Sequence, residues 1–93
     1  MDGLTEGRMV HYVLNQGPSK GEHRPAVVVK VWRVMDALGE LVPPGNGCCN
    51  LQVFTDGDGS NGNDGLARVL WQTSVLYEGP DGAPGTWHWI EKA

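Results

Sequence analysis

The longest apolar run of the chain, PAVVVKVWRV at residues 25–34, predicts a central β-strand. Valine disfavours helix and fits the pleated surface of a sheet. Because alternate residues of a strand face opposite sides, the face that we expect to line the core consists of Val27, Val29 and Val31. The opposite face consists of Ala26, Val28, Lys30, Trp32 and Val34. That face is too apolar to lie in water, so we predict that a loop, a second sheet layer or another chain covers Val28, Trp32 and Val34.

Other segments with strand patterns are residues 8–14, 48–55, 66–77 and 86–91. Both faces of 8–14 are half apolar, so the sequence does not decide which face points inward. In 48–55 apolar and polar residues alternate, which indicates a strand with one buried and one wet face. The buried face consists of Cys49, Leu51 and Val53, and the wet face of Asn50 and Gln52. Residues 66–77 fit both helical and strand spacing, and their Val, Trp, Thr and Tyr content favours a strand.

The segments between these strands are rich in glycine and proline, which favour turns. Residues 35–47, MDALGELVPPGNG, predict mostly loop, with room for one helical turn at 36–41. Five short strands joined by such turns, with almost no helix, are typical of a small antiparallel barrel or sandwich. We therefore expect one all-β domain over residues 1–93, a five-stranded barrel or sandwich of SH3-like or OB-like type.

Size and charge narrow the function classes. A single domain of 93 residues buries only about 60–65% of its unfolded surface, so a partner or oligomer would add stability. The net charge is −4, and the seven Lys and Arg residues are scattered, so we expect no nucleic-acid partner. The N-terminal residues lack a signal-peptide pattern, and no apolar run is long enough to span a membrane.

Two patterns resemble metal sites, and neither fits well. Residues 56–65, DGDGSNGNDG, have acidic and hydroxyl residues at EF-hand spacing but lack the required glycine and the final glutamate, so a turn is the better interpretation. The adjacent Cys48 and Cys49 could bind zinc only together with His11, His23 or His88, without the Cys-x-x-Cys or His spacing of structural zinc sites. We therefore expect no metal and no cofactor, and one cysteine in the core with the other outside it.

The chain has no sequence signature of a catalytic nucleophile and base, so we expect no enzyme and no catalytic residues. Trp87, His88 and Trp89 form the most informative cluster. In a strand the two Trp side chains share one face, which is either core or an exposed stacking platform. If the Trp face is core, the strand pairs into the sheet and at least one of these Trp side chains is largely buried, which is what we predict. His23 and Arg24 precede the central strand, where Arg24 is either a solvated charge or a clamp for a phosphate or carboxylate.

Five stretches, GRMVHYVL, GEHRPAVVVKVW, NLQVFTDG, NDG and PGTWHWIE, occur in an order that resembles a family of small uncharacterised proteins encoded by tailed phages and prophages. The resemblance spans nearly the whole chain. It implies a viral origin and a location in the virion or the host cytoplasm. The family has no agreed catalytic set, so the resemblance assigns no residue a role. The segments VPPGNGCC and DGDGSNG are longer in this chain than in the family pattern.

These observations favour a non-enzymatic virion structural or interaction protein, such as a capsid decoration or head–tail accessory protein. Its partners would be other virion proteins or copies of itself, without nucleic acid or membrane. The alternative is an anti-defence protein that sequesters a small nucleotide signal as an oligomer. The candidate binding or interface residues are Val28, Trp32, Val34, His23, Arg24, Trp87, His88 and Trp89.

Overall fold

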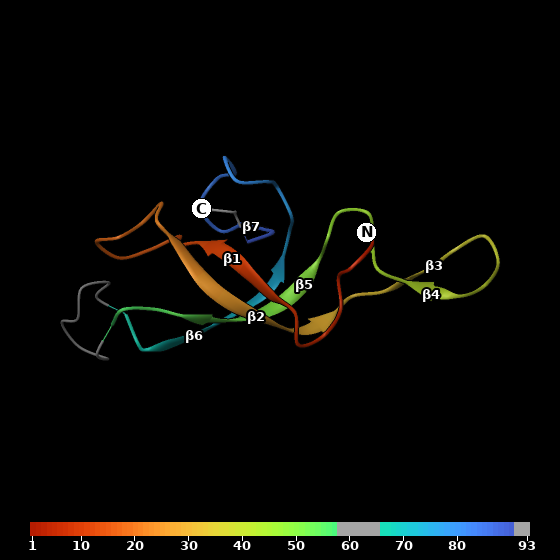
Figure 1. Cartoon of the computed structure of the whole chain (residues 1–93), viewed down its shortest axis with the longest axis horizontal. Coiled ribbons are helices and arrows are strands. Elements are labelled where there is room, and N and C mark those ends of the chain that lie inside the picture. Colours follow the sequence, from red (N-terminus) through yellow and green to blue (C-terminus); the bar gives the residue numbers. More distant parts are fainter. Residues whose placement is uncertain (58–65, 91–93) are drawn as a thin grey trace.

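A computed structural model of the chain describes residues 1–57 and 66–90. The molecule is elongated, with principal extents of 50 × 23 × 19 Å (Figure 1). Its strands are β1 (Met9–Val13), β2 (His23–Val31), β3 (Val34–Met35), β4 (Leu41–Val42), β5 (Cys49–Phe54), β6 (Val69–Val75) and β7 (Trp87–His88). The described residues include no helix, and so none long and apolar enough to cross a membrane.

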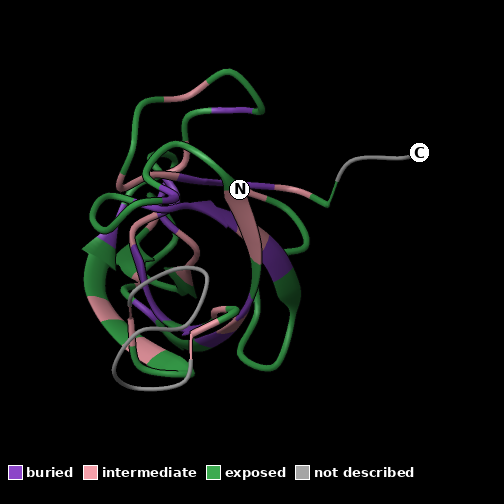
Figure 2. Cartoon of the chain, turned by 90° about the vertical axis from the view of Figure 1, so that its left-hand side faces the viewer, coloured by how far each residue is buried: buried purple, intermediate pink, exposed green. Residues whose placement is uncertain are grey.

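The main sheet has five antiparallel strands in the order β6-β5-β2-β1-β7. This architecture confirms the all-β class and all five expected strands, although β7 is much shorter than the segment that predicted it. The sheet curls strongly around a common interior (Figure 2). A bridge between Trp87 and Tyr77 links β7 to the segment that follows β6. Among the described residues these contacts form no closed barrel.

The central strand β2 differs from the predicted alternation. Its pairing with β5 is regular up to Val28, opposite Leu51, and resumes with Lys30 opposite Asn50, so Val29 is an extra residue. Such a bulge reverses the parity of the side chains beyond it. Val31 is buried as expected, but Val29 is exposed and Val28 lies in the chain's own core.

The predicted core face was therefore wrong for Val27 and Val29 and right for Val31, which follows the bulge. Ala26 and Val28 face the core, and Val27 is only half-buried. β1 and β5 likewise supply core residues at alternate positions, as the sheet pleat requires. β1 settles the face that its sequence left open, because Val10 and Tyr12 are fully buried. The remaining buried apolar residues of the core cluster are Leu4, Leu14, Val31, Cys49, Leu51, Val53, Val75 and Trp87.

Asn50 is the exception on the wet face of β5. Its side chain is buried, and its Oδ1 accepts hydrogen bonds from Trp32 Nε1 and from the backbone N–H of Ser74, each at 2.9 Å. Ser74 has a φ of 53° at an irregularity of the β5–β6 pairing. Asn50 therefore holds both the distorted part of β6 and the Trp32 ring.

A second structural difference lies in residues 35–47, where β3 and β4 form a hairpin that projects from one end of the molecule (Figure 1). The single helical turn expected at 36–41 is absent. Asp36 Oδ1 accepts hydrogen bonds from the backbone N–H groups of Leu38 and Glu40, each at 2.9 Å. Gly39, with a φ of +81°, supplies the left-handed residue that this turn requires. Local hydrogen bonding to Asp36 therefore builds a hairpin instead of a helix.

The base of this hairpin is tied to the N-terminal segment. Arg33 forms a two-pronged ion pair with Glu6, both N–O distances being 2.8 Å. The Glu6 carboxylate also accepts the backbone N–H of Val31 at 2.9 Å. The hydrogen bonds from Arg33 and then from Val31 hold the pKa of Glu6 well below its usual range.

We expect this carboxylate to make the unfolding free energy depend on pH. Its pKa is depressed in the folded state, so the stabilisation is present above the unfolded pKa of about 4.3 and is lost as pH falls towards the folded pKa. Denaturant titrations of the natural chain and of Glu6→Gln should differ most near neutral pH and converge below about pH 4. A difference that stays constant from neutral to acidic pH would contradict this account.

Candidate functional site

Three histidines, the full complement of the chain, come together at the edge of the main sheet that β7 forms. His11 in β1 and His88 in β7 are direct partners across the strands, so their side chains share a face. His23 begins β2 opposite Val13, two residues beyond His11, which places it diagonally across from His11 on that same face. The sheet register alone therefore collects three imidazoles from three adjacent strands.

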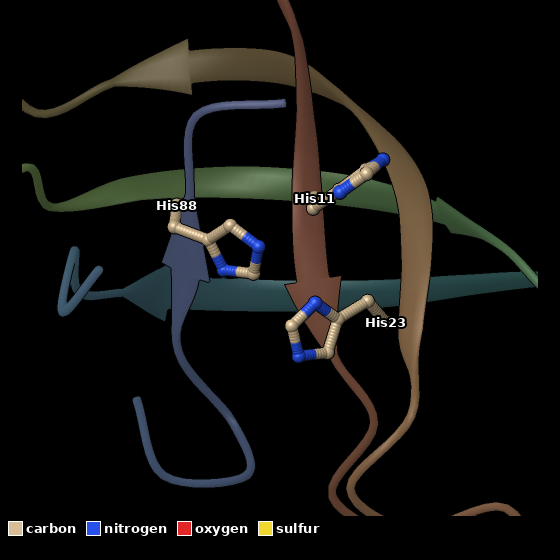
Figure 3. A group of neighbouring side chains, drawn as sticks. All are labelled: His11, His23 and His88. Carbon is tan, nitrogen blue, oxygen red and sulfur yellow. The ribbon is translucent and has the colours of Figure 1, made fainter. Parts of the chain in front are cut away.

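The rings lie edge to face in a compact group (Figure 3). The ring centroids of His23 and His88 are 4.6 Å apart, those of His11 and His88 5.6 Å, and those of His11 and His23 6.4 Å. One ring nitrogen of each residue can be chosen so that all three lie within 4.8 Å of one another. His88 is buried, with 1% of its surface exposed, while His11 and His23 are half-buried.

The cysteines are not part of this group. Cys49 lies in the core, where burial and then the neighbouring Cys48 raise the pKa of its thiol to about 12. Cys48 is half-buried, and the two form no disulfide. The expected division of one core cysteine and one outside is confirmed. The mixed Cys and His zinc site considered from the sequence does not form, because the histidines gather without either thiol.

The Trp87–Trp89 cluster belongs to the core. Trp87 is fully buried, and its Nε1 donates to the Gly47 carbonyl at 2.8 Å. Trp89 is half-buried, meets the Trp87 ring edge to face at 4.9 Å, and carries the Arg8 guanidinium 4.8 Å from its ring centroid. The prediction that this strand pairs into the sheet and buries at least one Trp is confirmed. His88 consequently faces away from the core, towards the other histidines.

Arg24 is separated from His23 by the alternation of β2, since neighbouring strand residues face opposite sides. Its guanidinium lies 3.5 Å from the Glu22 carboxylate and donates to the His23 carbonyl at 3.0 Å. The ligand pocket that would combine Arg24, His23 and the Trp pair is therefore not assembled in the single chain. The described residues form no pocket.

Trp32 and Val34 keep large exposed fractions, 46% and 49%. Trp32 lies between β2 and the β3–β4 hairpin, with the Lys30 ammonium 5.7 Å from its ring centroid. Their expected coverage by a loop, a second sheet layer or another chain stays a prediction. For Val28 that prediction was wrong, because Val28 lies in the chain's own core.

Sequence reasoning missed two features. The exposed apolar residues of the hairpin, Met35, Leu38 and Leu41, lie in a segment that we expected to be mostly loop. The signal was Asp36 followed by Gly39 between apolar residues, which favours a hairpin turn. The histidine group could not be predicted because it depends on strand order, which no local pattern encodes.

The calcium interpretation of residues 56–65 falls largely on 58–65, outside the described residues. The chain matches no protein-family model, no curated protein and no solved structure.

Proposed function

We propose that this chain is a non-enzymatic structural protein of a phage virion that assembles through its β3–β4 hairpin, which we call the arm (residues 34–42). The observation that carries the proposal is the apolar surface of the arm. The exposed fractions are 49% for Val34, 66% for Met35, 85% for Leu38 and 65% for Leu41. Exposed apolar residues grouped on one projecting element indicate an interaction surface.

The arm is a built element and not an incidental loop. Each of its strands is only two residues long, and an isolated hairpin of two strands is at best marginally stable in water. Asp36 and Gly39 nevertheless define its turn, and the Arg33–Glu6 ion pair fixes its base. A defined hairpin that covers little of its own apolar surface gains stability when a partner covers it.

A second copy of the chain is the partner that the surface favours. β6 begins at the end of the molecule away from the arm (Figure 1). On the outer face there, Phe54 pairs with Val69, and Trp71 follows two residues on, so the three share a face. All three are more than 40% exposed. Two apolar surfaces at opposite ends suit head-to-tail contacts, which produce rings or filaments.

The virion setting rests on the resemblance to small phage proteins. Rings and filaments are the forms in which repeated virion components assemble, so a capsid decoration or a head–tail accessory protein is the specific role that we propose. The curl of the sheet and the Tyr77–Trp87 bridge support the finer expectation of an SH3-like or OB-like barrel. No feature of the described residues favours the alternative, an anti-defence protein that sequesters a nucleotide.

We expect Leu41→Asp to convert an oligomer into a monomer, because it places a charge on the apolar surface of the arm. Losing one apolar anchor of an interface costs about 2 kcal/mol or more, roughly a 30-fold loss of affinity. Size-exclusion chromatography with light scattering measures the change. Ile90→Asp is the matched control, because Ile90 is 49% exposed and lies on neither surface, so this variant should remain oligomeric.

Trp71→Asp should also produce a monomer, because it disrupts the apolar surface at the end of the molecule opposite the arm. A mixture of the Leu41→Asp and Trp71→Asp variants should then form a dimer that grows no further, since each supplies the surface that the other lacks. A natural chain that stays monomeric at all concentrations would contradict self-assembly. Its absence from the protein list of purified virions would contradict the virion role, whatever its oligomeric state.

A further inference from the structure

We propose that His11, His23 and His88 together bind one divalent transition-metal ion of the zinc class. The three side chains come from three neighbouring strands, and their nearest set of ring nitrogens lies within 4.8 Å (Figure 3). This inference does not depend on the proposed role in assembly, because the arm and the histidines lie on different elements.

The donor set selects the metal. Neutral imidazole is a preferred ligand of zinc, copper and nickel, whereas calcium and magnesium require oxygen ligands. The group consists of three histidines with no carboxylate or thiol, within the part of the chain that the structure describes. Three protein ligands leave a fourth tetrahedral position, which water fills in known zinc sites of this kind.

The geometry requires only side-chain adjustment. With Zn–N distances of roughly 2.0–2.1 Å, the nitrogens of a tetrahedral site lie about 3.3 Å apart. The present upper limit of 4.8 Å is about 1.5 Å longer, a difference that rotation of half-buried His11 and His23 towards His88 can remove. His88 is the most buried of the three, so it is the fixed point around which the site closes.

The position of the site indicates what the ion would do for the protein. β7 is a two-residue strand, and His88 is one of those two residues. An ion held by all three histidines would cross-link β7 to β1 and to the start of β2, and would join His11 to His88, which are 77 positions apart in the sequence. Because the site forms only in the folded chain, binding would add directly to the stability of a small domain.

The test is calorimetric titration of zinc chloride into the untagged full chain after treatment with a chelator. We expect one equivalent to bind and the melting temperature to rise with zinc but not with magnesium. His23→Gln, at a half-buried position at the start of β2, removes a ligand and should weaken binding by more than the roughly 10- to 100-fold that loss of an outer-shell partner causes. His11→Gln should do the same, and the cobalt complex of the natural chain should show the visible absorption of a tetrahedral site.

Cys48→Ser is the matched control, because Cys48 is the half-buried thiol that competes as a zinc ligand. This variant should bind zinc as tightly as the natural chain. The proposal is overturned if the folded natural chain takes up no zinc at stoichiometric concentration, if His23→Gln binds unchanged, or if Cys48→Ser alone abolishes binding. Circular dichroism of the His11, His23 and Cys48 variants tests whether each is folded. The test does not use His88→Gln, because His88 is the most buried of the three histidines and its replacement is the one most able to prevent folding.

Discussion

Replacing Trp87 by Ala should lower the free energy of unfolding by about 3–5 kcal/mol, the range for removing a buried Trp side chain. A natural domain has only about 5–15 kcal/mol in total, and a chain of this size lies towards the lower end. We therefore expect Trp87→Ala to be largely unfolded at 37 °C or to melt far below the natural chain. Thermal and denaturant unfolding followed by circular dichroism measure the effect.

The reason lies in how many elements meet at this ring. Trp87 is fully buried, pairs with Tyr12 across the strands, and is bridged to Tyr77. Its ring contacts those of Tyr77 and Trp89 edge to face, at centroid distances of 5.0 and 4.9 Å. Alanine would also remove the hydrogen bond that the Trp87 indole N–H donates to the Gly47 carbonyl. The ring therefore joins β7, β1, the loop before β5 and the segment that follows β6.

Trp71→Ala is the matched control, since Trp71 is 51% exposed on the outer face of β6. In solutions dilute enough for the melting temperature to be independent of concentration, it should cost less than about 1 kcal/mol, as surface substitutions usually do. Equal losses for the two Trp variants would contradict the central position of Trp87 in the core.

Local pattern predicted most of the sheet. The alternation in residues 48–55 identified β5 and its buried Cys49, Leu51 and Val53, because one face of this strand is core and the other is solvent. The Trp pair near the C-terminus predicted a buried aromatic, which is Trp87. Such inferences succeed where side-chain burial follows directly from the period of the strand.

Pattern failed where one residue changed the register. The bulge at Val29 exchanged the faces of β2, so that Val28 entered the core and Val29 left it. A run of valines carries no signal for a bulge, because every position is equally apolar. The histidine group was beyond local pattern for a different reason: His11, His23 and His88 meet only because β1 lies between β2 and β7.

The arm also shows how a short polar signal can outweigh composition. Gly39 and the two prolines suggested a loop, yet the Asp36 carboxylate organises a hairpin turn around Gly39. Its apolar residues remain exposed because the two strands project away from the core of the domain (Figure 1). The same carboxylate that defines the turn therefore presents the surface that we propose for assembly.

Gly47→Ala should cost much more stability than a Gly→Ala substitution in a turn where the new Cβ meets open space. Gly47 has a φ of +71°, and left-handed backbone costs a residue with a Cβ about 1–2 kcal/mol. A Cβ at this position would also lie 2.6 Å from Tyr77 Cβ and 2.9 Å from Trp87 Cζ2. Neither atom is the free end of a flexible side chain, so the core around Trp87 must shift, at about 1–3 kcal/mol more.

Gly21→Ala separates these two costs. Gly21 has a φ of +94°, but a Cβ there would meet nothing within 4 Å. We expect Gly21→Ala to lose only the backbone term of about 1–2 kcal/mol, and Gly47→Ala to lose about 2–5 kcal/mol. Denaturant unfolding of both variants measures the difference, and the near-ultraviolet circular dichroism of Gly47→Ala should change because the Trp87 ring is displaced. Similar losses for the two variants, with an unchanged aromatic signal, would show that the Gly47 turn can move away from Trp87, and that the hydrogen bond between them does not fix the packing of the core.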